Sequence, residues 1–264
     1  MYTKTKEEIE ILRKSSLLVG KTLAELAKEI KPGVSTKYLD KLAETFIRDH
    51  GAIPGFLNYN GFPATLCISI NDTVVHGIPS DKLVLKDGDI VSIDCGTIID
   101  GWYGDSAFTY EVGEVDPKIK QLLKVTRESL EKGIEQAVAG KRIGDIGHAV
   151  QAYVEQYGYS VVRDLVGHGI GKNMHESPEI PNYGRRGNGL KLKEGLVICI
   201  EPMVNLGTYT VKMLEDGWTI KTLDGLPSAH FEKQLVVQKN KPDVLTDYSE
   251  IDNEINKKNN KLIN

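Results

Sequence analysis

The stretch Ile90-Val91-Ser92-Ile93-Asp94 returns later in the chain as Val197-Ile198-Cys199-Ile200-Glu201, where a buried-type run again ends in an acid. The two stretches are 107 residues apart, and the same offset places Leu85-Lys86-Asp87-Gly88 on Leu192-Lys193-Glu194-Gly195. Further upstream the offset matches two pairs of glycines, Gly33 with Gly140 and Gly51 with Gly158. One offset that holds across a helix, a turn and a strand indicates two similar halves, at about residues 5–115 and 117–240. The alternative is a weak match between unrelated helix-turn-strand units.

The hydrophobic spacing predicts helices ahead of strands in each half. Helical periodicity covers about residues 5–30, 35–50, 117–139 and 143–157, and strand-like runs cover about 65–70, 89–99, 102–112, 196–204 and 230–237. Helices followed by strands, twice over, favour an α+β fold over an alternating α/β fold. No linker rich in Pro, Gly or Ser separates the halves, so residues 1–242 are expected to form a single domain. The polar remainder, residues 243–264, is expected to be disordered or to form a short polar helix.

The composition is that of a soluble globular protein. Of the 264 residues, 40% are hydrophobic and 27% are charged, and the net charge of −4 gives no reason to expect nucleic acid or an anionic membrane as a partner. No apolar run approaches the roughly 20 residues that span a bilayer, and the N-terminus has no signal-peptide pattern. A cytoplasmic location is therefore expected. The three cysteines, Cys67, Cys95 and Cys199, lie far apart in apolar runs and are expected to be reduced, buried thiols.

A tight hairpin brings two acids together. Asp100-Gly101 is a strong two-residue turn signal between two strand-like runs, and it predicts that Asp94 faces Ala107 with Asp105 as its diagonal neighbour on one sheet face. Two such carboxylates repel each other in an apolar setting unless a cation lies between them. The hairpin has no Lys or Arg nearby for a salt bridge, so a metal ion is the favoured partner.

Glu201 becomes a second-half counterpart of Asp94 through the 107-residue repeat, and Glu232 lies in a further strand-like run, where alternation places His230, Glu232 and Gln234 on one face. Among the histidines, His168 is bounded by glycines that let the backbone approach a neighbour closely. His76 and His175 also lie in loops bounded by Gly or Pro, where functional residues concentrate. His50 and His148, both on predicted helices, are expected to be surface or satisfied structural residues, and His230 is ambiguous. Asp94, Asp105, His168, Glu201 and Glu232 together would make a mostly oxygen site suited to a pair of Mn, Fe(II), Co or Zn ions.

Several strings of residues closely resemble the type I methionine aminopeptidases, in their short bacterial form. They are Asn71-Asp72-Thr73-Val74-Val75-His76-Gly77-Ile78-Pro79, Ser92-Ile93-Asp94-Cys95-Gly96, Gly104-Asp105, Gly167-His168-Gly169-Ile170-Gly171, Met174-His175-Glu176, Ile200-Glu201-Pro202 and Phe231-Glu232. The resemblance runs over about residues 5–240 and implies the pita-bread fold, in which two pseudo-symmetric halves share a curved, mostly antiparallel sheet covered by helices.

The resemblance also implies roles for individual residues. Asp105 and Glu232 would bridge two divalent metal ions, Asp94 would complete one ion, and His168 and Glu201 the other. Glu201 would accept a proton from water, while His175 and His76 would contact the substrate without binding metal. The methionine pocket would be lined by Tyr59, Phe62, Cys67 and Trp218, with core packing as the alternative for each, and Phe62 and Phe56 depart from residues common in related enzymes.

The implied substrate is a nascent polypeptide that begins with methionine followed by a small residue. The ribosome near its exit tunnel is a further candidate partner, and a monomer is expected. Two competing interpretations share the fold: a proline-specific peptidase, which carries an extra N-terminal domain, and a non-enzymatic binding protein, which loses metal ligands. All five candidate ligands are present in this chain.

Overall fold

The computed structural model describes residues 2–263 and has the α+β pita-bread architecture expected from the sequence. The helices are α1 (Lys6–Glu29), α2 (Thr36–Asp49), α3 (Pro117–Ile134), α4 (Ile143–Glu155) and α5 (Ser249–Ile263). The strands of the first half are β1 (Ile53–Pro54), β2 (Leu66–Ile70), β3 (Thr73–Val75), β4 (Ile90–Ile99) and β5 (Trp102–Glu111). Those that follow are β6 (Ser160–Val161), β7 (Gly167–Gly169), β8 (Glu176–Ile180), β9 (Val197–Ile200), β10 (Met203–Asn205), β11 (Val211–Met213), β12 (Ile220–Thr222), β13 (Ser228–His230), β14 (Lys233–Val236) and β15 (Asp243–Val244).

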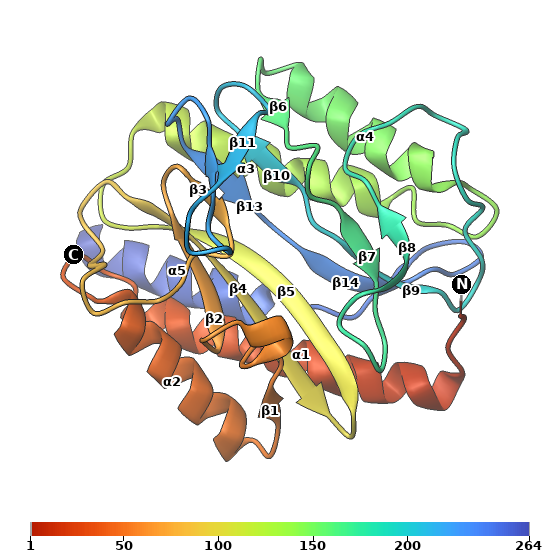
Figure 1. Cartoon of the computed structure of the whole chain (residues 1–264), viewed down its shortest axis with the longest axis horizontal. Coiled ribbons are helices and arrows are strands. Elements are labelled where there is room, and N and C mark those ends of the chain that lie inside the picture. The colour runs from red at the N-terminus through yellow and green to blue at the C-terminus, as the bar shows by residue number, and fades with distance from the viewer. Residues whose placement is uncertain (1, 264) are drawn as a thin grey trace.

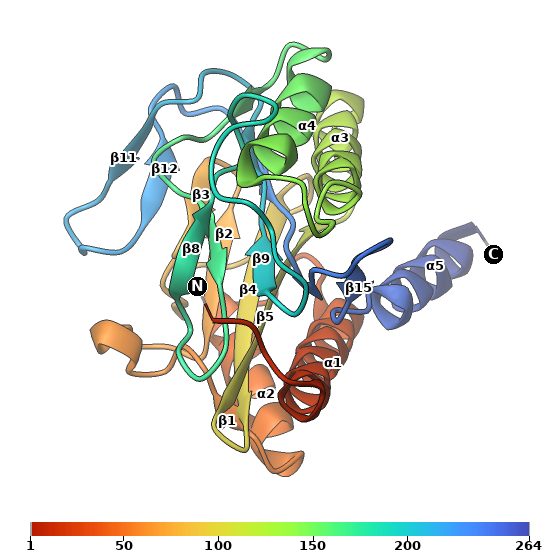
Figure 2. The same ribbon diagram turned by 90° about the vertical axis from the view of Figure 1, so that its right-hand side faces the viewer.

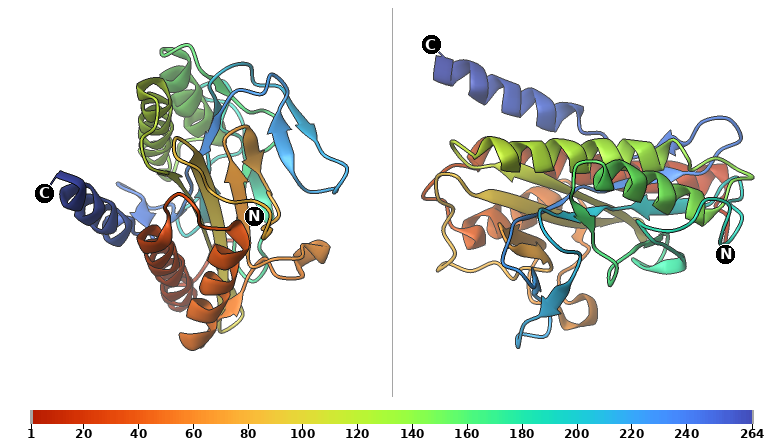
Figure 3. Two further views of the ribbon diagram at one scale, coloured as in Figure 1. Left: turned by 90° about the vertical axis from the view of Figure 1, so that its left-hand side faces the viewer. Right: turned by 90° about the horizontal axis from the view of Figure 1, so that it is seen from above.

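The helices form one layer and the strands form a second layer, one face of which the helices leave open (Figure 1). Seen edge-on, α1, α3, α4 and α5 lie on one side of the strands, while β8 and the β11–β12 hairpin lie on the other side (Figures 2 and 3). The principal apolar core lies between the layers and takes residues from both halves, among them Leu23 of α1, Ile93 of β4 and Ile200 of β9. One face of the sheet is thus sealed by helices, and any site that admits a substrate must open on the other face.

The backbone shows the same 107-residue repeat as the sequence. Gly33 and Gly140 have φ values of 92° and 98°, and each donates its N–H across the same turn, to the carbonyl oxygens of Leu85 and Leu192. The isolated bridge between Ser35 and Val84 has its counterpart 107 residues later, between Arg142 and Lys191. Helix α4 begins at the position that matches the start of α2. Equivalent glycines therefore occupy equivalent turns ahead of α2 and α4, because the left-handed conformation they adopt is strained for other residues.

Two predicted strands are each broken in the middle. The run expected over 196–204 divides into β9 and β10, which belong to different sheets, and the run expected over 230–237 divides into β13 and β14. The first break falls at Glu201-Pro202, where proline has no N–H to donate to a ladder. The second falls at Phe231-Glu232. Both breaks occur at a predicted metal ligand, where the chain passes from one sheet to the next.

The first-half hairpin has the predicted register. Strand β5 runs along one side of β4, and β2 and β1 share the other side, all of them antiparallel. Asp100 and Gly101 both have positive φ, at 50° and 79°, as a two-residue turn of this kind requires. Helix α3 ends earlier than the expected residue 139, because Val138 forms a bridge with Gln238 instead of continuing the helix.

The polar C-terminal segment forms the polar helix that was one of its two expected states. Helix α5 packs beside α1 (Figure 3). Tyr248 and Ile251 are buried, so the segment reaches the core despite its polar composition.

Candidate active site

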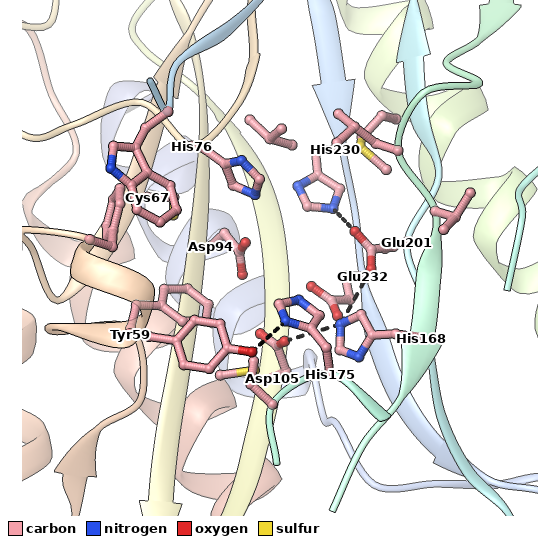
Figure 4. Close-up of a pocket in the computed structure, with 18 of the residues that line it drawn as sticks. Tyr59, Cys67, His76, Asp94, Asp105, His168, His175, Glu201, His230 and Glu232 are labelled. Atoms are coloured by element: carbon pink, nitrogen blue, oxygen red, sulfur yellow. Dashed lines mark hydrogen bonds and ion pairs between the residues drawn. The ribbon is translucent and has the colours of Figure 1, made fainter. Parts of the chain in front are cut away.

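A cavity of about 200 Å³ opens on the face of the sheet that the helices leave free. Its walls carry every candidate site residue named from the sequence, from both halves of the chain (Figure 4). The lining residues are Phe56, Tyr59, Asn60, Phe62, Cys67, Val75, His76, Asp94, Asp105, Leu165, Val166, His168, Met174, His175, Glu201, Met203, Trp218, His230 and Glu232. The scattered sequence positions therefore meet in one place.

The hairpin supplies two acids to the cavity. Asp94 of β4 faces Ala107, and Asp105 of β5 faces Gly96, so the two carboxylates share one face of the sheet as diagonal neighbours. The small side chain of Ala107 leaves room beside Asp94. Asp105 is almost completely buried, at 4% exposure. The hairpin turn thus determines the spacing of both carboxylates.

The strand breaks supply the other two acids. Glu201 follows β9 directly, and Glu232 lies between β13 and β14, at 1% exposure. The Glu232 backbone is held against β5, since its N–H donates to the Ala107 carbonyl at 3.0 Å and its own carbonyl accepts from the Ser106 hydroxyl at 2.5 Å. This anchoring places the Glu232 carboxylate over the same sheet face as Asp94 and Asp105.

His168 on β7 completes this set. Its Nε2 lies 3.6 Å from Asp105 Oδ2 and 3.5 Å from Glu201 Oε1, and its Nδ1 lies 2.9 Å from the Gly169 carbonyl oxygen. A Cβ on Gly167 would lie 2.4 Å from the Cys199 carbonyl oxygen, so the flanking glycine allows β7 to approach its neighbour. With Nδ1 donating to a backbone carbonyl, Nε2 is the ring nitrogen that faces the carboxylates.

The charges in this cluster are poorly balanced by protein groups. Burial, followed by repulsion from Asp105, raises the pKa of Asp94 and Glu232 well above the ordinary range for carboxyls. Burial lowers the pKa of His168, but Asp105 and Glu201 outweigh that effect and raise its pKa to about 9. Asp94 Oδ1, Asp105 Oδ1 and Glu232 Oε1 are buried without a hydrogen-bond partner among the described residues. Partnerless buried oxygens that face each other fit divalent cations.

Two residues beyond the predicted ligand set also lie in this cluster. Asp105, His168, Cys199 and Glu232 each present a ligand atom within 4.8 Å of the others, and Glu201, His230 and Glu232 form a second such group. His230 was left ambiguous by the sequence and is buried, with Nε2 3.6 Å from Glu201 Oε2. Cys199 was expected only as a buried thiol, and all three cysteines are indeed free and buried. Alternation along each strand was the signal for both residues, because Cys199 shares a strand face with Glu201, and His230 with Glu232.

The predicted substrate-contacting histidines both line the cavity, with His76 drawn above Asp94 and His175 below it in Figure 4. The ring of His175 lies 4.4 Å from that of His168, and its Nδ1 is 2.8 Å from the Tyr59 hydroxyl. His76 has a positive φ of 59°, an unusual conformation for a non-glycine residue and one that functional sites often contain. Burial lowers the pKa of His175 and lowers that of His76 to about 4, so both rings are neutral near pH 7.

Aromatic and sulfur-containing side chains form the opposite wall. Phe62 makes an edge contact with Trp218 at 5.1 Å between ring centroids, and His76 lies edge-on to the same indole at 6.4 Å. Cys67 faces Asp94 across the β2–β4 pair. Phe56 also lines the cavity and packs with this group. The cluster of carboxylates and imidazole therefore adjoins an apolar compartment. The surface histidines His50 and His148 lie outside the cavity and are exposed, as expected.

Comparison with known proteins identifies the family. The profile of metallopeptidase family M24 matches residues 10–239. The chain belongs to this family. It is 54% identical to a methionine aminopeptidase of Clostridium acetobutylicum over 92% of this chain and 97% of that protein. It is 51% identical to methionine aminopeptidase 1 of Bacillus subtilis, over 92% of this chain and 98% of that protein.

Solved structures agree with this assignment. The crystal structure of methionine aminopeptidase from Rickettsia prowazekii superposes with a TM-score of 0.92 at 46% identity, covering 93% of this chain and 99% of that one. The prolidase of Pyrococcus horikoshii superposes with a TM-score of 0.74 at 24% identity and covers 63% of that chain. Prolidases thus share the fold, while the methionine aminopeptidases match over nearly their full length.

Proposed function

We propose that this protein removes the N-terminal methionine from polypeptides whose second residue is small, and that it uses two divalent metal ions to do so. The observation that carries the proposal is one cavity that combines a buried cluster of carboxylates and imidazole with an aromatic compartment. The high identity to methionine aminopeptidases over nearly the whole chain supports it. No observation favours proline-specific cleavage. A non-enzymatic protein of this fold would lack some of the metal ligands, whereas this chain has all five candidates.

Asp94, Asp105, His168, Glu201 and Glu232 would hold the metal ions, and the resemblance implies the bridging role for Asp105 and Glu232. Divalent ions at such a site lower the pKa of water and polarise a carbonyl, which is the chemistry that peptide hydrolysis needs. Co, Mn, Fe(II) and Zn all suit carboxylate and imidazole ligands. Glu201 is the proposed general base: its carboxylate is less buried than that of Glu232, and it lies at the edge of the cluster, where it accepts a proton from the attacking water.

His175 is the proposed donor to the scissile carbonyl. Burial raises the pKa of Tyr59, so its hydroxyl remains protonated and donates to His175 Nδ1. The neutral ring then carries its hydrogen on Nε2, where it stabilises the oxyanion that forms during hydrolysis. His76 contacts the substrate from the other side of the cavity, and its neutral ring adds no positive charge next to the substrate amine.

The methionine side chain is proposed to lie among Tyr59, Phe62, Cys67 and Trp218. A thioether makes favourable contacts with aromatic ring edges, and Phe62 and Trp218, which contact each other edge to face, both line the cavity. The apolar lining of this compartment would favour an apolar side chain at the first position.

The substrates are proposed to be nascent polypeptides in the cytoplasm, met near the ribosomal exit tunnel by a monomeric enzyme. Within residues 2–263, no helix combines the length and apolarity that crossing a bilayer requires.

A peptide assay tests the proposal. Release of methionine from Met-Gly-Met is compared with cleavage of a Xaa-Pro peptide, each with and without chelator and with Mn, Co or Fe(II) restored. We expect chelator-sensitive release of methionine and no cleavage of the proline peptide. Activity that survives complete chelation, or cleavage of the proline peptide alone, would overturn the proposal.

A further inference from the structure

The segment that follows the family match, from residue 240 onward, reaches back beneath the metal-ligand cluster. Strand β15 pairs with β14, so the chain runs alongside the strand that begins just after Glu232. Beyond β15 the segment turns toward β5 and buries Tyr248 at 3% exposure. A polar tail that lies beyond the family-model match thus contacts the backbone that carries the site.

Tyr248 binds the backbone of one proposed bridging ligand. Its hydroxyl oxygen accepts from the Glu232 N–H at 3.2 Å, and the hydroxyl lies 2.7 Å from the Ala107 carbonyl oxygen and 2.5 Å from that of Glu232. A hydroxyl has one hydrogen, so it donates to one of these two carbonyls at a time. Burial raises the pKa of Tyr248, which keeps this hydrogen in place. The side chain therefore ties Glu232 to β5 at the residue opposite Asp94.

The same segment supports the other proposed bridging ligand through one intermediate residue. The Gln234 N–H donates to the Thr246 hydroxyl at 3.0 Å, and the Leu245 N–H donates to the Gln234 carbonyl at 2.9 Å. Gln234 in turn accepts the Asp105 N–H on its Oε1 at 3.1 Å. The Ser16 hydroxyl of α1 donates to that same oxygen at 2.7 Å. The backbone of Asp105 is therefore held by a side chain whose position depends on the tail.

Helix α5 holds this segment in place. Ile251 is fully buried, and Asp252 accepts two hydrogen bonds from Arg127 of α3, each at 2.7 Å. The segment also comes very close to α1: a Cβ on Gly20 would lie 2.6 Å from the Asp247 carbonyl oxygen. A glycine in the middle of a helix makes the helix less stable than an alanine would. The close approach of Asp247 explains why α1 nevertheless has a glycine at this position.

We infer that residues 243–252 are a positioning clamp for the metal centre, in which the Tyr248 hydroxyl orients Glu232 and Thr246 orients Asp105 through Gln234. The inference rests on the proposed function, because it takes these two carboxylates as metal bridges. Groups that orient metal ligands typically change metal affinity 10- to 100-fold when they are removed. The clamp therefore makes metal affinity dependent on a segment outside the catalytic repeats.

The test compares Tyr248→Phe with Tyr110→Phe in the full-length protein. Tyr110 is the matched control, since it is equally buried at 3%, also packs on Phe108, and donates its hydroxyl to the Leu23 carbonyl away from the site. Isothermal titration of metal-free protein with Mn²⁺ gives Kd, and thermal unfolding of the metal-free protein gives Tm. We expect Tm to fall by a similar amount in both variants. Only Tyr248→Phe should bind Mn²⁺ with a Kd that is higher by about tenfold or more.

A second pair of variants tests the clamp without removing any of its hydrogen bonds directly. Gly20→Ala adds a methyl group against Asp247, and Lys21→Ala alters the neighbouring exposed position. We expect Gly20→Ala to lower Tm and weaken Mn²⁺ binding, although alanine normally stabilises a helix, and Lys21→Ala to leave Kd within twofold.

The outcomes separate the two claims. Wild-type protein that takes up no Mn²⁺ would refute the proposed function, and the clamp with it. Wild-type protein that binds Mn²⁺, with an unchanged Kd in Tyr248→Phe or equal changes in Tyr248→Phe and Tyr110→Phe, would refute the clamp alone.

Discussion

At the scale of single residues, burial keeps the rings of His76 and His175 neutral beside a cluster of buried carboxyl groups. His175 lies close to His168 and within hydrogen-bond distance of Tyr59, yet burial lowers its pKa. A neutral ring can donate a hydrogen bond to a carbonyl without bringing a second positive charge toward divalent cations. His168 occupies the opposite situation, since its Nε2 faces two carboxylates. Two neighbouring histidines are thus assigned a substrate role and a ligand role by their surroundings.

This assignment predicts the behaviour of His175→Ala. Without the Nε2–H donor, the developing oxyanion loses one hydrogen bond, and kcat for Met-Gly-Met should fall by roughly 10²- to 10³-fold. Elemental analysis should find the same metal content as in the wild type, because His175 is not among the proposed ligands. His168→Ala is the contrasting variant and should lose metal. Metal loss from His175→Ala would show that the roles of the two histidines have been misassigned.

At the scale of elements, turns and strand breaks determine where the proposed ligand side chains point. A continuous strand through Glu201 would alternate its side chains regularly and remain in one sheet. Pro202 interrupts the ladder instead, and the chain continues as β10 in another sheet. The corresponding break at Glu232 is closed by hydrogen bonds to Ser106 and Ala107 of β5. The breaks allow ligands from the second half to meet the continuous β4–β5 hairpin of the first.

The hairpin turn gives a prediction at this scale. Gly101 has φ of 79°, and a Cβ there would meet nothing within 4 Å. Gly101→Val therefore adds backbone strain without a steric clash, and should lower the free energy of unfolding by about 1–2 kcal/mol in urea titration. Metal content should not change, because the register around Asp94 and Asp105 is held by β2 and β14 as well.

Asp100→Asn is the control for this variant. Asn tolerates the left-handed conformation that Asp100 adopts at φ of 50°, so the free energy of unfolding should stay within about 0.5 kcal/mol of the wild type. Equal destabilisation by both substitutions would contradict the explanation based on backbone conformation.

At the scale of the whole molecule, the site joins the two halves. Asp94 and Asp105 come from the first half, and His168, Glu201 and Glu232 come from the second. The cluster therefore places like charges across the seam of the pseudo-symmetric fold, and a bound cation would draw the halves together. Stability and metal content should be coupled as a result.

The coupling has a predictable pH dependence. In metal-free protein the pKa of Asp94 and Glu232 is raised by burial, and that of His168 is raised to about 9 by its carboxylate neighbours. Folded protein then binds more protons than unfolded protein, so the free energy of unfolding falls as pH rises. For the carboxyls this fall begins above their ordinary values near 4, and for His168 it lies between about 6.5 and 9.

Thermal unfolding from pH 5 to pH 9, with chelator or with Mn²⁺, measures this effect. We expect the Tm of chelated protein to decline as the pH rises. Mn²⁺ at 100 times its Kd should raise the free energy of unfolding by about 2.7 kcal/mol. Metal-free Glu232→Gln should show a shallower decline because one buried carboxylate is gone. Identical pH profiles with and without Mn²⁺ would contradict the coupling between metal and stability.

Local spacing in the sequence was sufficient to predict the repeat, the paired glycines, the hairpin register of Asp94 and Asp105, and the boundaries of α2 and α4. These features depend on residues close in the chain, through turn conformation and the two strand faces. Tertiary structure decided that the strands break at Glu201 and Glu232 and that Tyr248 reaches the site, and it brought His230 and Cys199, which strand alternation had only placed on the ligand faces, into one cluster. Those outcomes depend on which distant segments pack together, since a backbone N–H or carboxylate acquires its partner only when the sheets and the C-terminal segment are assembled.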